Sequence, residues 1–325
     1  MLIRIPNWLG DALMATPVYA NLSHIEPLIL FGPPSFLELF EDFPKTKVLP
    51  FYKENFRLNL ANLSRYREEK GLLLTNSFSS AWLFFRARLR VRMGFATDLR
   101  GLLLTQKVKP PKERMHQRDK YLYLIEKLGY PIKERELKLY LKEETLNQAK
   151  AYLKEWGLTP EREPFIILAP GAAFGPAKKW PEKYYRELAL KLISQGFRVL
   201  VVGGPKERKS GQLICEGLEG AYNLCGKTNL KILAGIFTLG KALISNDSGL
   251  MHLGAALKIP QIALFGSTDP TLTGPLNERA KIIKKELPCA PCFERTCPRK
   301  HYRCLLDITP DEVYQLVKEL LTPDP

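Results

Sequence analysis

The chain has 325 residues, of which 45% are hydrophobic and 26% are charged. This length exceeds the size at which a single hydrophobic core usually stops growing, so we expect two domains of roughly 150 residues. The composition is that of an ordinary globular protein and excludes a disordered or fibrous one. The formal net charge of +15 favours an anionic partner, such as nucleic acid, lipid headgroups or a phosphorylated substrate.

The first residues and the apolar runs bear on targeting. The opening segment MLIRIPNWLGDALM contains charged residues and a proline, so it lacks the apolar core that a signal peptide needs. The longest apolar runs, such as FIILA and RVLVV, are the size of strands and far shorter than a membrane-spanning helix. We therefore expect a cytoplasmic protein that meets a membrane only from its surface.

In chain order, short apolar runs alternate with helical patterns, which is typical of an α/β fold of parallel sheets with crossover helices. The first half contains predicted strands at Leu2–Ile5, Leu28–Phe31, Val48–Pro50, Leu72–Thr75 and Arg90–Gly94. A charged stretch from Lys133 to Trp156 favours a helix, and the Gly and Pro residues from Gly157 to Pro164 mark a linker. The sequence therefore predicts domains at residues 1–158 and 159–325.

The second half has clearer strand signals. The predicted strands are Phe165–Ala169, Arg198–Val202, Ala221–Leu224, Ala242–Ser245 and Gln261–Phe265. A last helix is predicted over residues 311–321, where apolar residues recur at helical spacing. Its apolar face should pack on the body of the protein, and one arrangement would bring the helix back toward the first domain.

Ligands of open α/β sheets bind beyond the carboxyl ends of the strands. Asp11 follows the first predicted strand, in a turn that leads into a helix. It could simply cap that helix, because Asp is a favoured N-cap residue. Alternatively, Gly10 lets a ligand approach the backbone and the Asp11 carboxylate takes a proton from an attacking hydroxyl.

The second half has three comparable segments. A glycine-containing loop with Lys178 precedes a helix that starts near Pro181, which is a pattern for binding anions, although neither a Walker loop nor G-x-G-x-x-G is present. Glu207 follows the next strand and is a candidate for binding ribose hydroxyls. The segment Ser245–Gly249 leads into another helix. It either binds a diphosphate through its small polar side chains and free amides, or only caps the helix. His252 in that helix is a core histidine or a ligand contact.

Several blocks in one order resemble the ADP-heptose:lipopolysaccharide heptosyltransferases of glycosyltransferase family 9. These blocks are RIPNWLGDALMATP, TNSFSSAW, RMGF, PGAAFGPAKKWPEKYY, SNDSGLMHLGAAL, ALFGSTDPTLTGP and the cysteine-bearing tail. The resemblance covers almost the whole chain. Ala173 and Phe174 stand where the type I branch has two threonines, which favours the type II branch.

The resemblance implies the GT-B architecture, with two Rossmann-like domains whose parallel sheets face a central cleft. It also implies an inverting, metal-independent transfer of heptose from ADP-heptose to the heptose-Kdo inner core on lipid A. Asp11 matches the family's general base and Lys178 its donor-phosphate lysine. The donor-binding residues that it implies are Gly10, Glu207, Thr228, Asp247, Ser248, Gly249 and His252.

The positive charge is concentrated in one stretch. Between Arg86 and Lys120 there are eleven Lys or Arg residues and three acidic ones, so this stretch supplies +8 of the +15. A solvated basic surface has the same composition, but a phosphorylated glycolipid at the anionic inner-membrane surface would be attracted there. The expected acceptor contacts are Asn76, Ser77, Arg86, Arg88, Arg90, Arg92 and Arg100.

Four cysteines near the end form the pattern C-x2-C-x4-C-x6-C, with His301 nearby. This density predicts a structural role, through bound zinc or through disulfides. The four residues are Cys289, Cys292, Cys297 and Cys304.

Two other functions fit parts of the pattern. A nucleotide-sugar epimerase, or a type I or III heptosyltransferase, would share the fold, although an epimerase has no need for a basic acceptor face. Nucleic-acid binding is disfavoured, because Phe and Tyr are not interleaved with the basic residues as a stacking platform requires.

Overall fold

The computed structural model describes residues 1–322 and divides the chain into two compact units. The first unit is Met1–Tyr140, and the second begins at Leu141. The sequence-based boundary after residue 158 therefore lies one helix further along the chain. The difference arises because helix α7 (Glu143–Glu155) packs against helix α10 (Leu230–Leu239) of the second unit.

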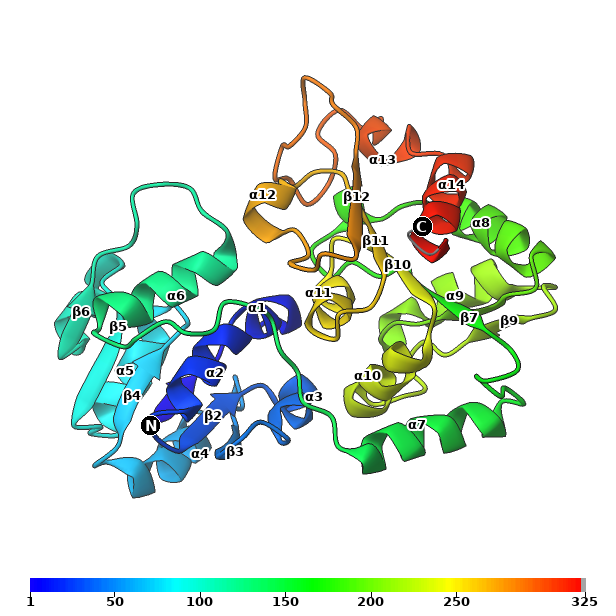
Figure 1. Ribbon diagram of the computed structural model, residues 1–325. Coiled ribbons are helices and arrows are strands. Elements are labelled where there is room, and N and C mark those ends of the chain that lie inside the picture. Colours follow the sequence, from blue (N-terminus) through cyan, green and yellow to red (C-terminus); the bar gives the residue numbers. More distant parts are fainter. Residues whose placement is uncertain (323–325) are drawn as a thin grey trace. The chain divides into compact units, whose positions relative to one another are not determined.

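The first unit is built on a six-stranded sheet in which all neighbouring strands are parallel, in the order β3-β2-β1-β4-β5-β6 (Figure 1). This is the doubly wound order of a Rossmann fold. The strands are β1 Leu2–Arg4, β2 Leu28–Gly32, β3 Thr46–Pro50, β4 Lys70–Leu73, β5 Val91–Phe95 and β6 Gln106–Val108. The helices are α1 Leu9–Met14, α2 Thr16–Ser23, α3 Pro34–Leu37, α4 Phe56–Leu63, α5 Phe78–Arg86 and α6 Gln117–Lys127, with 3-10 helices η1 Glu38–Phe40, η2 Ser64–Tyr66 and η3 Asp98–Leu103.

The second unit repeats this arrangement, with an all-parallel sheet in the order β12-β11-β10-β7-β8-β9. Its strands are β7 Phe165–Ala169, β8 Arg198–Val201, β9 Ala221–Asn223, β10 Ala242–Asn246, β11 Gln261–Phe265 and β12 Ala280–Lys284. Besides α7, its helices are α8 Glu182–Ser194, α9 Arg208–Cys215, α10 Leu230–Leu239, α11 Gly249–Ala256, α12 Pro270–Thr273, α13 Arg303–Leu306 and α14 Pro310–Leu321, with 3-10 helices η4 Pro176–Lys178 and η5 Pro205–Glu207. The predicted α/β class with parallel sheets is confirmed.

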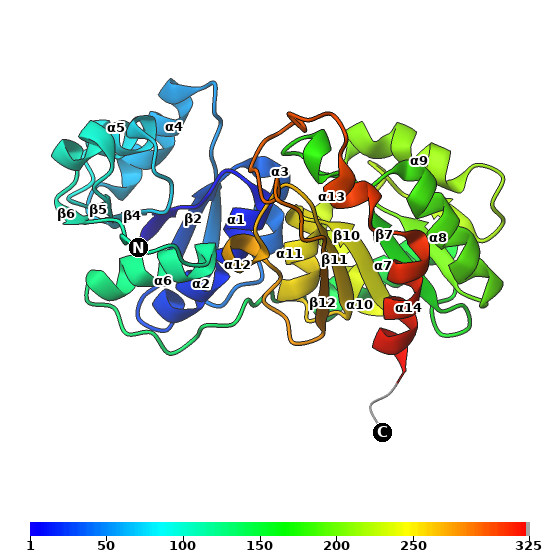
Figure 2. The ribbon, with the colours of Figure 1, turned by 90° about the horizontal axis from the view of Figure 1, so that it is seen from above.

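Helices cover both faces of each sheet. In the first unit, α4 and α5 lie on one face and α2 and α6 on the other (Figure 2). In the second unit, α8, α9 and α14 share one face with a continuous apolar cluster. The last helix, α14, packs against α8, β10 and β11, so its apolar face completes the core of its own unit.

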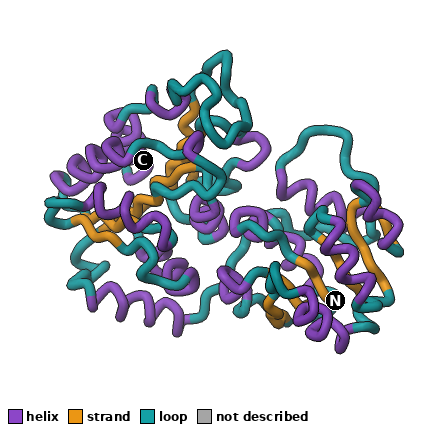
Figure 3. Tube along the Cα trace, turned by 180° about the vertical axis from the view of Figure 1, so that it is seen from behind, coloured by secondary structure: helices purple, strands orange, loops and turns teal. Residues whose placement is uncertain are grey.

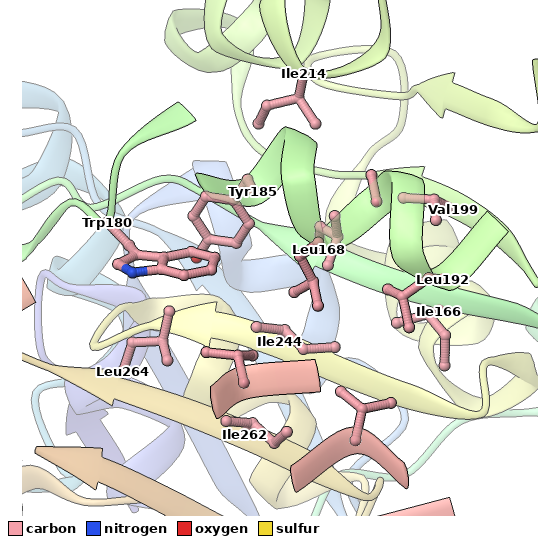
Figure 4. Close-up of a cluster of buried hydrophobic side chains, with 14 of the residues drawn as sticks. Ile166, Leu168, Trp180, Tyr185, Leu192, Val199, Ile214, Ile244, Ile262 and Leu264 are labelled. Atoms are coloured by element: carbon pink, nitrogen blue, oxygen red, sulfur yellow. The ribbon is translucent and has the colours of Figure 1, made fainter. Parts of the chain in front are cut away.

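The core of the second unit follows the two-residue period of its strands. Ile166 and Leu168 of β7 point into the cluster under α8, together with Ile244 of β10 (Figure 4). Trp180 and Tyr185 close one end of this cluster, with ring centroids 4.8 Å apart and planes at 81°. Burying each such side chain contributes about 1.5–3 kcal/mol, so this packing holds the loop before α8 in place.

Two long segments lack helices and strands (Figure 3). One joins α6 to α7, so the predicted helical stretch from Lys133 to Trp156 is helical only from Glu143 to Glu155. The other, residues 285–302, joins β12 to α13 and carries three of the four clustered cysteines. Over residues 1–322, no helix is both long enough and apolar enough to cross a membrane.

Candidate active site

In each sheet the strand order reverses between two central strands, β1 and β4 in the first unit and β7 and β10 in the second. Such switch points are where open α/β sheets bind ligands, because the loops after the two strands diverge there. The loop after β1 leads to Asp11, and the loop after β7 leads to Lys178. Both predicted catalytic residues therefore follow a switch-point strand of their own unit.

Asp11 lies in the first turn of α1 and is partly buried. The N-cap of this helix is Trp8, which makes no side-chain cap hydrogen bond, so Asp11 does not serve as the N-cap. Gly10 is the residue before it inside the helix. The hydroxyl of Tyr121 on α6 donates a hydrogen bond to Asp11 Oδ1 at 3.5 Å. The structure thus gives the carboxylate a positioning partner that the sequence did not indicate.

The surroundings of Asp11 are buried and polar. Burial, together with the nearby Asp11 charge, raises the pKa of the Tyr121 hydroxyl well above its usual value, so this group stays a hydrogen-bond donor. Behind it, Arg4 at the end of β1 is almost fully buried, and burial lowers its pKa to about 9. The Arg4 guanidinium packs 3.7 Å from the ring centroid of Phe51 and donates a hydrogen bond to Asn7.

A pocket of about 800 Å³ opens at the same edge of the first sheet, where β1, β2 and β3 end. Its wall is mostly apolar, with one lysine and one glutamate at the rim. Buried Asn59 fixes one side of the pocket, because its side chain both donates to the Tyr52 carbonyl and accepts from the Tyr52 amide. The pocket is lined by Asn7, Trp8, Pro33, Pro34, Phe51, Tyr52, Lys53, Glu54 and Asn55. Short-range sequence patterns do not indicate this pocket, because its wall comes from the loops after three different strands.

The predicted acceptor contacts begin in the loop after β4, on the other side of the switch point. Asn76 is exposed there, and Ser77 is the N-cap of α5, where its hydroxyl accepts from the Ser80 amide at 3.3 Å. Ser77 therefore has a structural role besides any ligand contact. The exposed basic side chains of this region include Arg86, Arg88 and Arg90.

Arg92 and Arg100 do not present free guanidinium groups, in contrast to the expectation. Arg92 donates to the backbone carbonyls of Leu103 and Leu89 at 2.7 and 2.5 Å. Arg100 is fully buried, donates to the Thr75 carbonyl, and has its pKa lowered to about 10 by burial. These two arginines hold η3 and β5 in place. The sequence placed them at the surface because short-range patterns cannot distinguish an inward-pointing arginine from an exposed one.

In the second unit, Lys178 and Asp247 form a buried ion pair, with Lys178 Nζ 2.5 Å from Asp247 Oδ2. Their side chains are only 12% and 5% exposed. Thr268, after β11, donates its hydroxyl to the same Asp247 oxygen at 2.6 Å. The ring of Phe174 lies 4.8 Å from Lys178 Nζ. The two predicted donor-site residues are thus brought together, and Thr268 is an additional member that sequence reasoning missed.

Asn246 connects the two loops at this switch point. Its side chain donates to the Pro170 carbonyl at 2.7 Å and accepts from the Trp180 amide and the Tyr185 hydroxyl, both at 3.1 Å. The loop after β7 is therefore tied to the end of β10. Asn246 lies in the SNDSG block. Its burial could not be predicted from the sequence, because asparagine is usually exposed.

The remaining donor candidates lie around the same edge of the second sheet. Glu207 caps η5 by accepting from the Gly204 amide at 3.0 Å, and it packs on the loop after β7 so closely that a Cβ on Gly171 would lie 3.1 Å from Glu207 Cγ. Thr228 lies in the loop before α10 and is partly exposed. The Glu207 carboxylate can accept hydrogen bonds from hydroxyl groups of a ligand.

Helix α11 begins directly after Asp247. Ser248 is its N-cap residue, yet its hydroxyl makes no cap hydrogen bond, and within the described residues its buried Oγ has no hydrogen-bond partner. Gly249 is the first helical residue, and His252 is buried in the same helix. The first amides of a helix and an unsatisfied hydroxyl are groups that an anionic ligand can satisfy.

The four clustered cysteines are free thiols, and Cys289 Sγ lies 3.9 Å from His301 Nε2. Burial, and then the neighbouring thiols of Cys297, Cys292 and Cys289, raise the pKa of the Cys304 thiol to about 11. Over residues 1–322, no group of three His, Cys, Asp or Glu side chains has an arrangement that could hold a metal ion.

Two doubly wound sheets in one chain, each with polar residues at its switch point, form the GT-B fold, which is the fold of a large class of glycosyltransferases. The chain belongs to glycosyltransferase family 9 (heptosyltransferase), whose model matches residues 60–303.

Among its relatives, a lipooligosaccharide heptosyltransferase 2 of Campylobacter jejuni is 33% identical, and the alignment covers 99% of each chain. The structure of E. coli ADP-heptose LPS heptosyltransferase II has 28% identity and a TM-score of 0.85, covering 98% of each chain. E. coli heptosyltransferase WaaC with ADP has 21% identity and a TM-score of 0.76, covering 98% of this chain and 99% of the other, and it shows the shared fold.

The resemblance stated from the sequence motifs is confirmed, as are the glycosyltransferase class and the GT-B fold. The roles of the individual residues are not tested by these likenesses and stay predictions.

Proposed function

We propose that this protein transfers L-glycero-D-manno-heptose from ADP-heptose to the heptose-Kdo inner core of lipopolysaccharide, as a type II heptosyltransferase. The observation that carries the donor half of this proposal is the Lys178–Asp247 ion pair at the switch point of the second unit. The names of two relatives that match over nearly the whole chain, a lipooligosaccharide heptosyltransferase 2 and an ADP-heptose LPS heptosyltransferase II, support the choice of sugar and acceptor.

The second unit holds the nucleotide-sugar in this proposal. Lys178 Nζ and the first amides of α11 stabilise the negative charge that grows on the diphosphate as ADP departs. Asp247 fixes the direction of the Lys178 ammonium. Lys178 and Thr268 both bond to Asp247 Oδ2, so Asp247 Oδ1 and the Thr268 oxygen can accept hydrogen bonds from the hydroxyls of the sugar. Glu207 binds the ribose hydroxyls, and Thr228 contacts the adenine.

The first unit holds the acceptor. The aromatic wall of its pocket, with Trp8 and Tyr52, suits the apolar faces of sugar rings, and Lys53 suits an acidic group of the inner core. Asp11 takes the proton from the acceptor hydroxyl while that oxygen bonds to the anomeric carbon of the heptose. The bond to the ADP oxygen breaks on the opposite face, so the configuration inverts. Tyr121 orients the carboxylate during this step.

No metal ion takes part in this proposed reaction, because Lys178 and helix amides supply the positive potential that the leaving diphosphate needs. Turnover should therefore survive chelation by EDTA and dialysis. A loss of activity that Mg²⁺ alone restores would contradict this part of the mechanism.

The cysteine cluster has a structural role in this proposal, through bound zinc or through disulfides, with no part in the chemistry. Metal analysis of the purified protein, together with thiol titration before and after reduction, distinguishes these two states. Four reactive thiols and no metal would exclude both.

The acceptor is a membrane glycolipid, so we place the enzyme at the cytoplasmic face of the inner membrane, bound to its anionic surface. Nucleic acid has no role in the proposed function.

The test is incubation with ADP-heptose and lipid A cores of defined length, with the products measured by mass spectrometry. We expect one heptose to be added only to a core that already carries one. Addition to a core without heptose would instead indicate a type I enzyme. Conversion of ADP-heptose without any acceptor would indicate an epimerase.

A further inference from the structure

A group of large apolar side chains is exposed on the first unit. Three come from helix α5 and two from the neighbouring 3-10 helix η3, which packs beside α5. Leu99 and Leu102 of η3 are 74% and 82% exposed, more than any other large apolar side chain in the described part of the chain. We call this group the α5–η3 patch, and its members are Phe78, Trp82, Phe85, Leu99 and Leu102.

The α5 side chains of the patch share one surface because of helix geometry. Phe78, Trp82 and Phe85 are spaced by four and three residues, so they share one face of α5. The rings of Trp82 and Phe85 stack with centroids 5.6 Å apart. The opposite face of α5, with Ala81 and Phe84, is buried in the core of the unit.

On η3 the two leucines are three residues apart, which in a 3-10 helix places them on the same side. Arg100 lies between them and points inward, where its guanidinium donates to the Thr75 carbonyl. The buried arginine therefore anchors η3 while Leu99 and Leu102 face solvent. Single exposed leucines are common on protein surfaces, but five large apolar side chains on two packed elements mark an interaction surface.

The rim of the patch is cationic. Arg86 Cζ lies 5.5 Å from the centroid of the Trp82 ring, and Arg92 Cζ, although its guanidinium donates to backbone carbonyls, lies 5.5 Å from that of Phe85. Arg88 and Arg90 are exposed at the end of α5. Elsewhere in this basic stretch, Lys107 is exposed on β6, and Lys109, Lys112 and Arg114 are exposed in the segment that follows it.

This combination identifies the kind of partner. Trp and Phe side chains surrounded by Arg and Lys are what an interfacial protein places at the boundary between headgroups and acyl chains of an anionic bilayer. A second copy of this chain is disfavoured, because a symmetric contact through the patch would bring two like-charged rims together.

We propose that the α5–η3 patch docks the protein on an anionic phospholipid bilayer, with its apolar side chains entering the interface and its basic rim binding headgroups. This inference rests on the proposed function, whose acceptor is a membrane lipid, and it names the surface that meets that membrane. Helix α5 starts at the carboxyl end of β4, so the docked surface continues into the edge of the sheet that carries the switch-point loops.

The test is co-sedimentation with vesicles of phosphatidylcholine alone and of phosphatidylcholine mixed with phosphatidylglycerol, an anionic lipid whose headgroups attract basic side chains. The variant is Trp82→Gln with Leu102→Gln. The matched control is Leu190→Gln with Leu213→Gln, which removes two half-exposed leucines from helices of the second unit. None of these four residues belongs to the proposed catalytic or binding sites.

We expect wild type and control to bind the anionic vesicles, and the patch variant to bind at least about ten-fold more weakly, since two interfacial side chains are lost. Binding should weaken at high salt. Equal binding by the patch variant and the control would overturn the proposal, as would a wild-type dimer that the patch variant abolishes.

The vesicles contain no glycolipid and no nucleotide, so this result is independent of the transfer reaction. If vesicle binding fails while heptose transfer to a short water-soluble acceptor succeeds, only the docking surface is wrong. If binding succeeds while transfer fails, only the proposed function is wrong. The patch variant should stay folded at the temperature of the assay, because Leu102 is 82% exposed and Trp82 packs at the surface against Phe85.

Discussion

Replacing Lys178 by Met separates the structural role of the buried ion pair from its role in catalysis. Asp247 is only 5% exposed, and without Lys178 its carboxylate would keep the Thr268 hydroxyl and no adjacent cation within this cluster. Removing one member of a buried pair typically costs about 3–5 kcal/mol, because a buried charge is left uncompensated. We expect Lys178→Met to lower the free energy of unfolding by about that amount.

The double variant Lys178→Met with Asp247→Asn removes both charges. It should recover most of the lost stability, because a neutral amide costs far less to bury than an unpaired carboxylate. It should not recover turnover, because the cation that stabilises the departing diphosphate is still missing. Urea unfolding and initial rates of ADP release, measured on the same samples, provide both readouts.

Lys179→Met is the matched control, since Lys179 is the next residue in the AKKWP block and Lys178 alone forms the ion pair with Asp247. We expect its stability to stay within about 0.5 kcal/mol of wild type. The reasoning is refuted if Lys178→Met unfolds like the control, or if the double variant regains wild-type turnover.

Four further predictions follow from the structure. Asp11→Asn should fold normally and lose roughly 10²–10⁴-fold in turnover; wild-type rates would remove Asp11 from the mechanism. Tyr121→Phe should lower kcat with little change in KM, because Tyr121 orients Asp11 without touching substrate; a change in KM alone would contradict this role. Reversing the charge of Arg86, Arg88 and Arg90 should weaken acceptor and liposome binding but spare ADP binding, and equal loss of both in titration calorimetry would indicate misfolding. Burial raises the pKa of the Cys225 thiol to about 12, so the folded state keeps a proton that the unfolded state loses above pH 9; stability should fall as the pH rises through this window, and less so in Cys225→Ala, as followed by urea titrations.

Much of the fold was predictable because buried parallel strands are nearly continuous apolar runs. Phe165–Ala169 and Gln261–Phe265 were predicted with the bounds that β7 and β11 have. The two strands that were missed, β6 and β12, lie at sheet edges. Their sequences, QKV and AKIIK, contain lysines, which protect edge strands from further pairing and weaken the apolar signal.

The candidate site was predictable only in part. Asp11, Lys178 and Asp247 could be found because each follows a strand, and the carboxyl ends of the strands are where ligands bind. The sequence could not indicate that Lys178 and Asp247 form an ion pair, or that Tyr121 reaches Asp11 from a helix 110 residues away. Nor could it indicate that Arg100 points inward, because these arrangements depend on tertiary packing.

The hydrogen bonds of Asn246 have a kinetic consequence. One buried amide ties the loop after β7 to the end of β10, so the lysine-bearing segment is already held before a nucleotide arrives. Little ordering should then remain for the binding step. We expect ADP to associate in one fast phase whose rate rises linearly with its concentration, without the plateau that a slow loop rearrangement would impose.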